Sequence, residues 1–303
     1  LSHFWSLGLN RISFGVQDFD AEVQQAVHRI QPYEQVELLM TAARRLGYQS
    51  INVDLIYGLP KQRPDNFART IEQVIGLAPD RIALYGYAHL PERFKPQRRI
   101  VSSELPDGAA RLSMLGHAIG AFGAAGYDYI GMDHFAKPDD PLAIAKRQGK
   151  LHRNFQGYTT QPECDMLGLG VSAIGRVGSV YAQNAKTIEG YENMVGQGRF
   201  ATVRGLQLSA DDLMRRSMIM DIMCRGRLDF AKVKAEFGVD VPTAFAAELA
   251  RLEPLAAHGL VKVGPGAVEV TPVGWYVVRA VAMAFDRYLA AAAATRASFS
   301  KIV

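Results

Sequence analysis

Three polar side chains stand where they could contact a ligand. Asp54 lies near the end of the apolar segment 50–57, and a carboxylate in such a segment must be paired or serve a function. Gln17 directly follows the apolar segment 11–16, and Arg29 comes shortly after it. These groups could bind hydroxyl, amine or carboxylate groups of a ligand. As alternatives, Asp54 caps a helix or pairs with an arginine, Gln17 is a solvated amide, and Arg29 is a surface residue.

Two histidines have charged neighbours in the chain. Asp133 precedes His134, and a carboxylate near an imidazole raises the imidazole pKa, as a proton-handling pair requires. Adjacent residues of a strand point to opposite sides, which favours a structural role instead. His152 and Arg153 leave the same two interpretations open. The sequence therefore assigns no catalytic residue.

A glycine-dense segment spans residues 167–175. Glycine backbone can approach an anion closely, but position 173 is Ala, so the Gly-x-Gly-x-x-Gly pattern is incomplete. We interpret this segment as a loop that closely approaches a ligand, and not as a dinucleotide site.

The elements that must position these side chains alternate between strand and helix. Strands are expected at residues 11–16, 50–57 and 81–87, and apolar residues recur at helical spacing after each of them. The three helical stripes are Val36, Leu39, Met40 and Ala43; Phe67, Ile71, Val74 and Ile75; and Leu112, Leu115, Ile119 and Phe122. Gly47 is placed to end the first helix. This alternation predicts a parallel sheet covered by helices, the α/β class.

Ligands of parallel α/β sheets bind at the carboxyl ends of the strands. That rule brings Gln17, Asp54 and the loop after Tyr87 to one edge. Three such strands cannot close a barrel, so the sequence predicts half of a barrel, incomplete at its N-terminus, over residues 1–205. A fourth apolar segment at 127–131 follows the third helix.

Residues 206–303 are expected to form a second, mostly helical domain. Asp229 could cap a helix, residues 260–270 resemble a hairpin, and a last helix is expected at about 273–292. This order is typical of a winged-helix-like module. The middle of the candidate recognition helix, about 242–257, has one arginine and one glutamate, too few polar groups to contact bases. We therefore expect no nucleic-acid partner.

Composition gives the expected setting of the protein. Hydrophobic residues make up 49% and charged residues 21% of the 303 residues, and the net charge is +4. No apolar run is long enough for a membrane span. Cys164 and Cys224 are too far apart to indicate a disulfide framework or a zinc site, so two inert thiols in a reduced cytoplasmic setting are expected.

Several segments together resemble the oxygen-independent coproporphyrinogen III oxidase (dehydrogenase) family of the radical S-adenosylmethionine (SAM) superfamily. They are residues 15–19, 52–60, 87–91, 130–136 and 151–160, and the similarity extends to the last five residues, 299–303. Their order and spacing match the family over essentially the whole chain. Residues 152–160, His-Arg-Asn-Phe-Gln-Gly-Tyr-Thr-Thr, separate the chain from shorter homologues that act as haem chaperones.

The resemblance implies a radical SAM (β/α)6 partial barrel followed by a helical domain. It further implies two bound SAM molecules and a 4Fe–4S cluster, which generate a 5′-deoxyadenosyl radical. Two propionates of coproporphyrinogen III would then lose carbon dioxide to give protoporphyrinogen IX, in haem biosynthesis. An electron donor or acceptor is implied as a partner, and we expect a cytoplasmic monomer.

The same resemblance implies site residues. Gln17, Arg29 and Asp54 match family positions that contact SAM, and Ala88 lines that site. Ile174 matches a contact of the second SAM, and Gln156 is expected to border it. Some basic residues should face the four propionates of the substrate, and Arg153, Arg98 and Arg99 remain open as candidates.

The chain departs from the family at the cluster. It lacks the Cys-x-x-x-Cys-x-x-Cys run, and Cys164 and Cys224 cannot replace three closely spaced thiolates, so we expect no metal ligands in this chain. We therefore expect the intact protein to be an oxidoreductase and the chain alone to be inactive. Two alternatives stay open: a cluster-free homologue that binds tetrapyrrole or haem, and a DNA-binding winged-helix protein.

Overall fold

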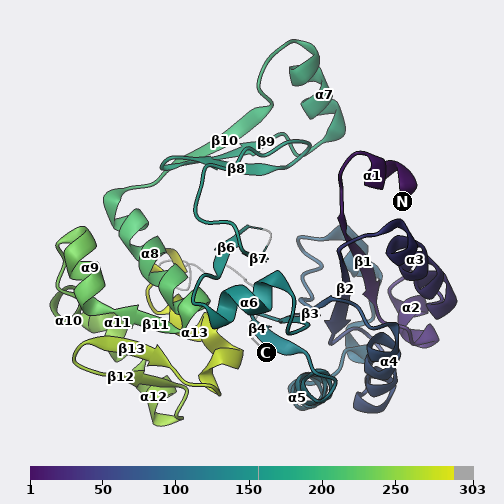
Figure 1. Ribbon diagram of the computed structural model, residues 1–303, viewed down its shortest axis with the longest axis horizontal. Helices are drawn as coiled ribbons and strands as arrows, with labels where there is room; N and C mark the ends of the chain where they lie inside the picture. The colour runs from purple at the N-terminus through teal and green to yellow at the C-terminus, as the bar shows by residue number, and fades with distance from the viewer. Residues whose placement is uncertain (156, 290–303) are drawn as a thin grey trace. The chain divides into compact units, whose positions relative to one another are not determined.

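A computed structural model describes residues 1–155 and 157–289 of the chain (Figure 1). The described residues form two compact units, and the chain passes from the first to the second between residues 144 and 145. The domain boundary predicted between residues 205 and 206 falls inside the second unit and stays a prediction.

The first unit is built on a five-stranded sheet with the order β1-β2-β3-β5-β4. The first three strands are parallel, as predicted, whereas β5 pairs antiparallel with both β3 and β4. The apolar segment at 127–131 therefore starts a hairpin at the edge of the sheet. The strands are β1 (Arg11–Gln17), β2 (Ser50–Tyr57), β3 (Arg81–Gly86), β4 (Asp128–Gly131) and β5 (His134–Ala136).

The helices that accompany these strands are α1 (Ser2–Ser6), α2 (Ala21–Ala26), α3 (Tyr33–Leu46), α4 (Pro64–Leu77) and α5 (Gly108–Ala124), with short 3₁₀ turns η1 (Lys95–Arg99) and η2 (Ser102–Glu104). The predicted helices α3, α4 and α5 follow β1, β2 and β3, and the further short helices and turns lie beside them in the chain. Gly47 ends α3 in the left-handed conformation, with φ of +88°, as predicted.

The expected stripe of α5 was wrong at one position. Leu112 is 58% exposed, and the buried residues of the helix are Met114, Ala118 and Phe122. The helix is apolar on several sides, so hydrophobic spacing alone did not fix which side faces the sheet.

The side chains of β2 alternate between an apolar face and a polar face of the sheet. Ile51, Val53 and Leu55 are fully buried and belong to the core, with Phe67 and Ile71 of α4 among its members. Successive side chains of a strand point to opposite faces, so Asp54 lies on the other face.

The second unit contains three small antiparallel sheets. Its first part consists of the C-terminal end of α6 (Pro141–Arg147), β6 (His152–Asn154), β7 (Gly157–Thr159), β8 (Ile174–Val177), β9 (Val180–Asn184), α7 (Ile188–Gly196) and β10 (Thr202–Gln207). Its second part consists of α8 (Ala210–Arg225), β11 (Arg227–Asp229), α9 (Phe230–Phe237), α10 (Val241–Ala244), α11 (Ala246–Ala250), α12 (Glu253–Ala257), β12 (Val261–Val263), β13 (Ala267–Val270), η3 (Gly274–Val277) and α13 (Val278–Met283).

The winged-helix-like order is present, but two predicted helices were wrong. Asp229 caps α9 as expected, and β12 pairs with β13 as the predicted hairpin. The segment 242–257 forms three short helices, two of which have a proline in their first turn. The last predicted helix is interrupted: α13 ends at Met283, residues 287–289 are again helical, and the part predicted at 290–292 lies outside the described residues.

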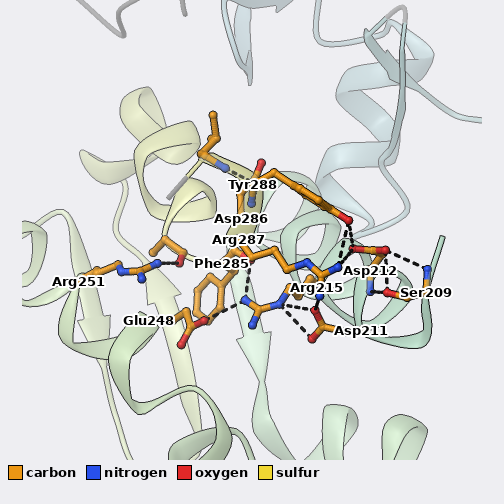
Figure 2. A network of polar contacts seen from close by, with 12 residues as sticks. Ser209, Asp211, Asp212, Arg215, Glu248, Arg251, Phe285, Asp286, Arg287 and Tyr288 are labelled. Atoms are coloured by element: carbon orange, nitrogen blue, oxygen red, sulfur yellow. Dashed lines mark hydrogen bonds and ion pairs between the residues drawn. The ribbon is translucent and has the colours of Figure 1, made fainter. Parts of the chain in front are cut away.

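A polar network holds the segment that follows α13 (Figure 2). The carbonyls of Ala284 and Phe285 accept hydrogen bonds from Arg251 at 3.2 Å and Arg215 at 3.1 Å, so two side chains serve carbonyls at the helix end. Arg215 of α8 also bonds Asp211 at 3.0 Å and Glu248 at 2.9 Å. The network thus holds the end of α13 against α8 and α11.

The first turn of α8 is fixed by a capping box. Ser209 accepts a hydrogen bond from the amide of Asp212, and the Asp212 carboxylate accepts one from the amide of Ser209. Tyr288 and Arg287 also contact the Asp212 carboxylate. The hydrogen bonds from Ser209, and then the hydrogen bond from Tyr288 and the charge of Arg287, hold the pKa of Asp212 below its usual value. The contribution of Asp212 to stability is therefore lost as the pH falls through that lowered pKa.

We predict that Arg215→Met lowers the free energy of unfolding by about 2–4 kcal/mol, because Glu248 loses its cation while partly buried. Chemical denaturation measures the change. Arg279→Met, at an exposed position of α13, is the matched control and should change stability by less than about 0.5 kcal/mol. Equal effects of the two substitutions would contradict a central role of Arg215.

Candidate functional site

Two of the predicted ligand-binding side chains meet at Gly15 on β1. A Cβ atom at Gly15 would lie 2.8 Å from Gln17 Nε2 and 3.2 Å from Arg29 Nη2. Arg29 Nη2 also donates a hydrogen bond to the Gly15 carbonyl at 2.7 Å. Only glycine therefore leaves room for both polar groups to lie over this strand.

Asp54 lies beside the same point, because Gly15 pairs with Asp54 in the β1–β2 register. Its carboxylate accepts hydrogen bonds from Ser13 Oγ at 3.1 Å and from Asn52 Nδ2 at 2.7 Å. Both partners lie on the polar face of the sheet. Neither is an arginine or the amide of a helix, the partners that the two alternatives for Asp54 required. The structure thus places Gln17 and Arg29 at Gly15 on β1 and Asp54 opposite Gly15 on β2, in the carboxyl-terminal halves of both strands.

Ala88 lies in the loop after β3, the neighbouring strand of the sheet. The Gln97 side chain holds this loop, since its Nε2 donates to the Ala88 carbonyl at 3.0 Å and its Oε1 accepts from the Leu90 amide at 2.5 Å. Ala88 therefore follows the same edge as Gln17 and Asp54, as the strand order predicted.

A buried network next to Gln17 was not found from the sequence. Asp18 is 1% exposed and accepts hydrogen bonds from Gln62 Nε2 at 2.5 Å, Thr70 Oγ1 at 2.8 Å and the Asp20 amide at 2.7 Å. Gln62 also accepts from the Leu59 amide at 2.9 Å. Asp18 thus ties the loop after β1 to the loop after β2.

Burial raises the pKa of Asp18 above its ordinary value, against its three hydrogen bonds. A raised pKa means that the folded state holds the proton more tightly than the unfolded state. The contribution of Asp18 to stability is therefore fully present at low pH and decreases as the pH rises through the raised pKa.

Asp133 and His134 lie at the turn between β4 and β5. Met132 and Asp133 both have positive φ, at 45° and 71°. His134 Nδ1 donates to the Met132 carbonyl at 2.6 Å, and its ring packs edge-on against Tyr85 with centroids 6.0 Å apart. The pair is thus part of a tight turn, and a proton-handling role stays a hypothesis.

The glycines of the 167–175 segment pack against backbone of the same hairpin. A Cβ at Gly168 would lie 2.8 Å from the Ile174 carbonyl carbon, and one at Gly175 would lie 2.7 Å from the Met166 carbonyl oxygen. Packing against the backbone therefore accounts for Gly168 and Gly175, and no ligand is needed to explain them. Ile174 lies on β8 and is 37% exposed, while Gln156 lies outside the described residues, so their contact with a second SAM stays a prediction.

The second unit contains a cavity of about 520 Å³ beside the predicted His152-Arg153 pair. It is lined by β6, the segment 159–166, β8, β9, α8 and α9. Both cysteines, Cys164 and Cys224, also line it. This size is typical of small-molecule sites.

The cysteines do not form a cluster site. Cys164 is exposed, whereas burial raises the pKa of the Cys224 thiol to about 11, so Cys224 is a thiol at neutral pH. No group of three or more His, Cys, Asp or Glu side chains that could hold a metal occurs within residues 1–155 and 157–289. The described residues therefore do not fit a 4Fe–4S cluster. In the same residues, no helix is long and apolar enough to cross a membrane.

Comparison with known proteins shows that this α/β fold is of the radical SAM class. Residues 1–74 match the Radical SAM superfamily, and residues 208–277 match the HemN C-terminal domain. The solved structure of the Escherichia coli coproporphyrinogen III oxidase, described as a radical SAM enzyme, is similar with a TM-score of 0.91 at 46% identity. That match covers 94% of this chain and 66% of the other. The predicted α/β fold with a helical C-terminal domain is thus confirmed.

Relatives named oxygen-independent coproporphyrinogen III oxidase give the family. The protein from Pseudomonas aeruginosa is 50% identical over 98% of this chain and 64% of its own length. The protein from Thermostichus vulcanus is 46% identical over 93% of this chain and 87% of its own length. The chain belongs to the oxygen-independent coproporphyrinogen III oxidase family. It spans 64% of the length of the Pseudomonas relative and 66% of that of the E. coli relative.

We predict that Asp18→Asn lowers the free energy of unfolding by about 1–3 kcal/mol, because the new amide turns a donor toward a donor of Gln62 or Thr70. Denaturation at several pH values measures this. The difference from the parent chain should widen as the pH falls toward about 4, since only the parent gains stability by protonating Asp18. Asp65→Asn, at an exposed position of α4, is the control and should change stability by less than about 0.5 kcal/mol. A difference that narrows at low pH would contradict the raised pKa.

Proposed function

We propose that the intact protein removes carbon dioxide from two propionates of coproporphyrinogen III, giving protoporphyrinogen IX, with SAM as the radical source. The observation that supports this most is the 50% identity over 98% of the chain to a relative named for this oxidation. The polar groups gathered at Gly15, where the radical SAM match lies, support it independently.

In this proposal, Gln17, Arg29 and Asp54 hold SAM at the carboxyl ends of β1 and β2. Arg29 uses one nitrogen on the Gly15 carbonyl and keeps further donors for an anionic carboxylate. The Asp54 carboxylate has acceptor capacity for an amine or for ribose hydroxyls beyond its bonds to Ser13 and Asn52. Ala88, in the loop after β3, lines the same site in this proposal. Ile174 and Gln156 would contact a second SAM.

SAM and a 4Fe–4S cluster held outside this chain would supply the radical chemistry for loss of carbon dioxide from the propionates. This chain contributes binding groups only. Because Cys164 and Cys224 are its only cysteines, we propose that the chain alone is inactive. We propose separately that the electron released with carbon dioxide passes to an external partner.

A tetrapyrrole-binding homologue without a cluster is the second candidate. The cavity of the second unit, which is of a size typical of small-molecule sites, favours it. Both candidates predict that the chain binds tetrapyrrole. Only the oxidase predicts turnover once the cluster ligands are supplied.

A chimera separates the two candidates. The chain is joined to the part of the Pseudomonas relative that the match leaves uncovered, reconstituted anaerobically with iron and sulfide, and given SAM, a reductant and coproporphyrinogen III. We expect protoporphyrinogen IX and two carbon dioxide per substrate, and no product from the chain alone. A chimera that assembles its cluster and binds substrate without turnover would support the binding protein instead.

We predict that Gly15→Ala weakens SAM binding about tenfold, because its methyl group displaces Gln17 Nε2 and Arg29 Nη2. Titration calorimetry on the chain measures this, and the fold should change little because only flexible side-chain ends are displaced. Gly120→Ala is the matched control, since open space surrounds that position on α5, and it should leave SAM affinity unchanged. Unchanged SAM affinity in the Gly15 variant would argue against SAM at this place.

A further inference from the structure

The cavity of the second unit is rich in charge. Its wall contains five cationic side chains, and four carboxylates lie among them. The cations are Arg153, Arg176, Arg216, Arg225 and Lys232, and the carboxylates are Glu163, Asp165, Asp221 and Glu236. How these charges pair decides what the cavity can bind.

Two of the carboxylates are each shared by two cations. Glu163 accepts from Arg216 and lies 2.9 Å from Arg176 Nη1, and the neighbouring guanidinium groups hold the pKa of Glu163 below its usual value. These carboxylates are committed to the protein, so they do not repel an incoming anion as free carboxylates would.

Asp221 of α8 is the second shared carboxylate. It pairs with Arg225 on its own helix and with Lys232 Nζ of α9 at 2.6 Å. Asp165 is also engaged, because it accepts a hydrogen bond from the Gly178 amide at 2.7 Å. The paired groups around Asp221 and Glu163 thus carry more positive than negative charge.

Arg153 differs from the other cations of the wall. Its guanidinium lies over the Tyr158 ring at 4.9 Å, and its Nη1 is buried without a hydrogen-bond partner among the residues that the structure describes. A buried donor without an acceptor costs free energy, which an anionic ligand would remove. The planar guanidinium suits a carboxylate, which accepts two parallel hydrogen bonds.

The remaining wall suits an aromatic ring next to that carboxylate. Phe155 is half exposed and packs edge-on against Tyr181, with centroids 5.1 Å apart. Tyr158 is fixed below Arg153, since its hydroxyl donates to the Met223 carbonyl at 2.8 Å. An anion bound at Arg153 would therefore lie near the aromatic rings of Phe155 and Tyr181, in a cavity whose five cationic side chains exceed its four carboxylates by one.

We propose that this cavity binds one propionate of the tetrapyrrole, with Arg153 as the group that bonds the carboxylate. This inference rests on the proposed function for the identity of the ligand. It selects Arg153 over Arg98 and Arg99, both exposed, as the residue that faces a propionate.

The test is a titration of the 303-residue chain with coproporphyrin III, the stable oxidised form that keeps all four propionates, followed by fluorescence. Arg153→Met should weaken binding about tenfold or more, and Arg153→Lys, which keeps the charge, should lose less. Arg99→Met is the matched control and should bind as the parent does. Binding of the tetramethyl ester and of SAM, each measured separately, should be equal in all four proteins.

Three outcomes would overturn the proposal. Equal affinity of the parent and Arg153→Met for coproporphyrin III would remove Arg153 from the site. A loss of SAM affinity alone would assign the carboxylate to SAM. A lower thermal midpoint together with an equal loss for the ester would show a structural role, whereas loss of an unpaired buried donor should leave the midpoint unchanged or raise it.

If the parent chain does not bind coproporphyrin III at all, the cavity is not a propionate site. The proposed function is judged separately, because the turnover of the chimera does not depend on which residue contacts the propionate.

Discussion

The alternation of side chains along three parallel strands is the constraint on which the first unit depends. Ile51, Val53 and Leu55 must face the core, so Asn52 and Asp54 must face the other side of the sheet. A shift of one residue in β2 would bury a carboxylate and expose the core residues. The same packing that stabilises the sheet therefore fixes the polar groups of the proposed SAM site, and Gly15 leaves space for Gln17 and Arg29 beside them.

Buried polar groups then hold the loops that the strands leave at this edge. Asp18 joins the loops after β1 and β2 through Gln62, although its burial is unfavourable to its charge. In the second unit, Arg215 plays a comparable part by fixing α8, the helix that presents Arg216, Asp221 and Cys224 to the cavity. In both units, a polar network that is not itself the site sets the geometry of the site.

Local patterns explain how much of this was predictable from the sequence. Strand and helix periods predicted β1–β3, α3 and α4, and the strand-end rule placed Gln17 and Asp54 at one edge. The role of Asp18 was not predictable, because its partners Gln62 and Thr70 come from a distant part of the chain. For the same reason, the sequence could not show that the neighbouring cations of the cavity are paired with carboxylates while Arg153 Nη1 has no hydrogen-bond partner among the described residues.

The account rests on a division of labour in which this chain binds ligands and does not hold the cluster. The most direct test is iron and acid-labile sulfide per chain after anaerobic reconstitution of the 303-residue protein. We predict that both stay near background, since Cys164 and Cys224 are fewer than the three thiolates that a cluster site requires and Cys224 is a buried thiol. Stoichiometric binding of about four irons and four sulfides would contradict the account, because ligands in this chain would then hold a cluster.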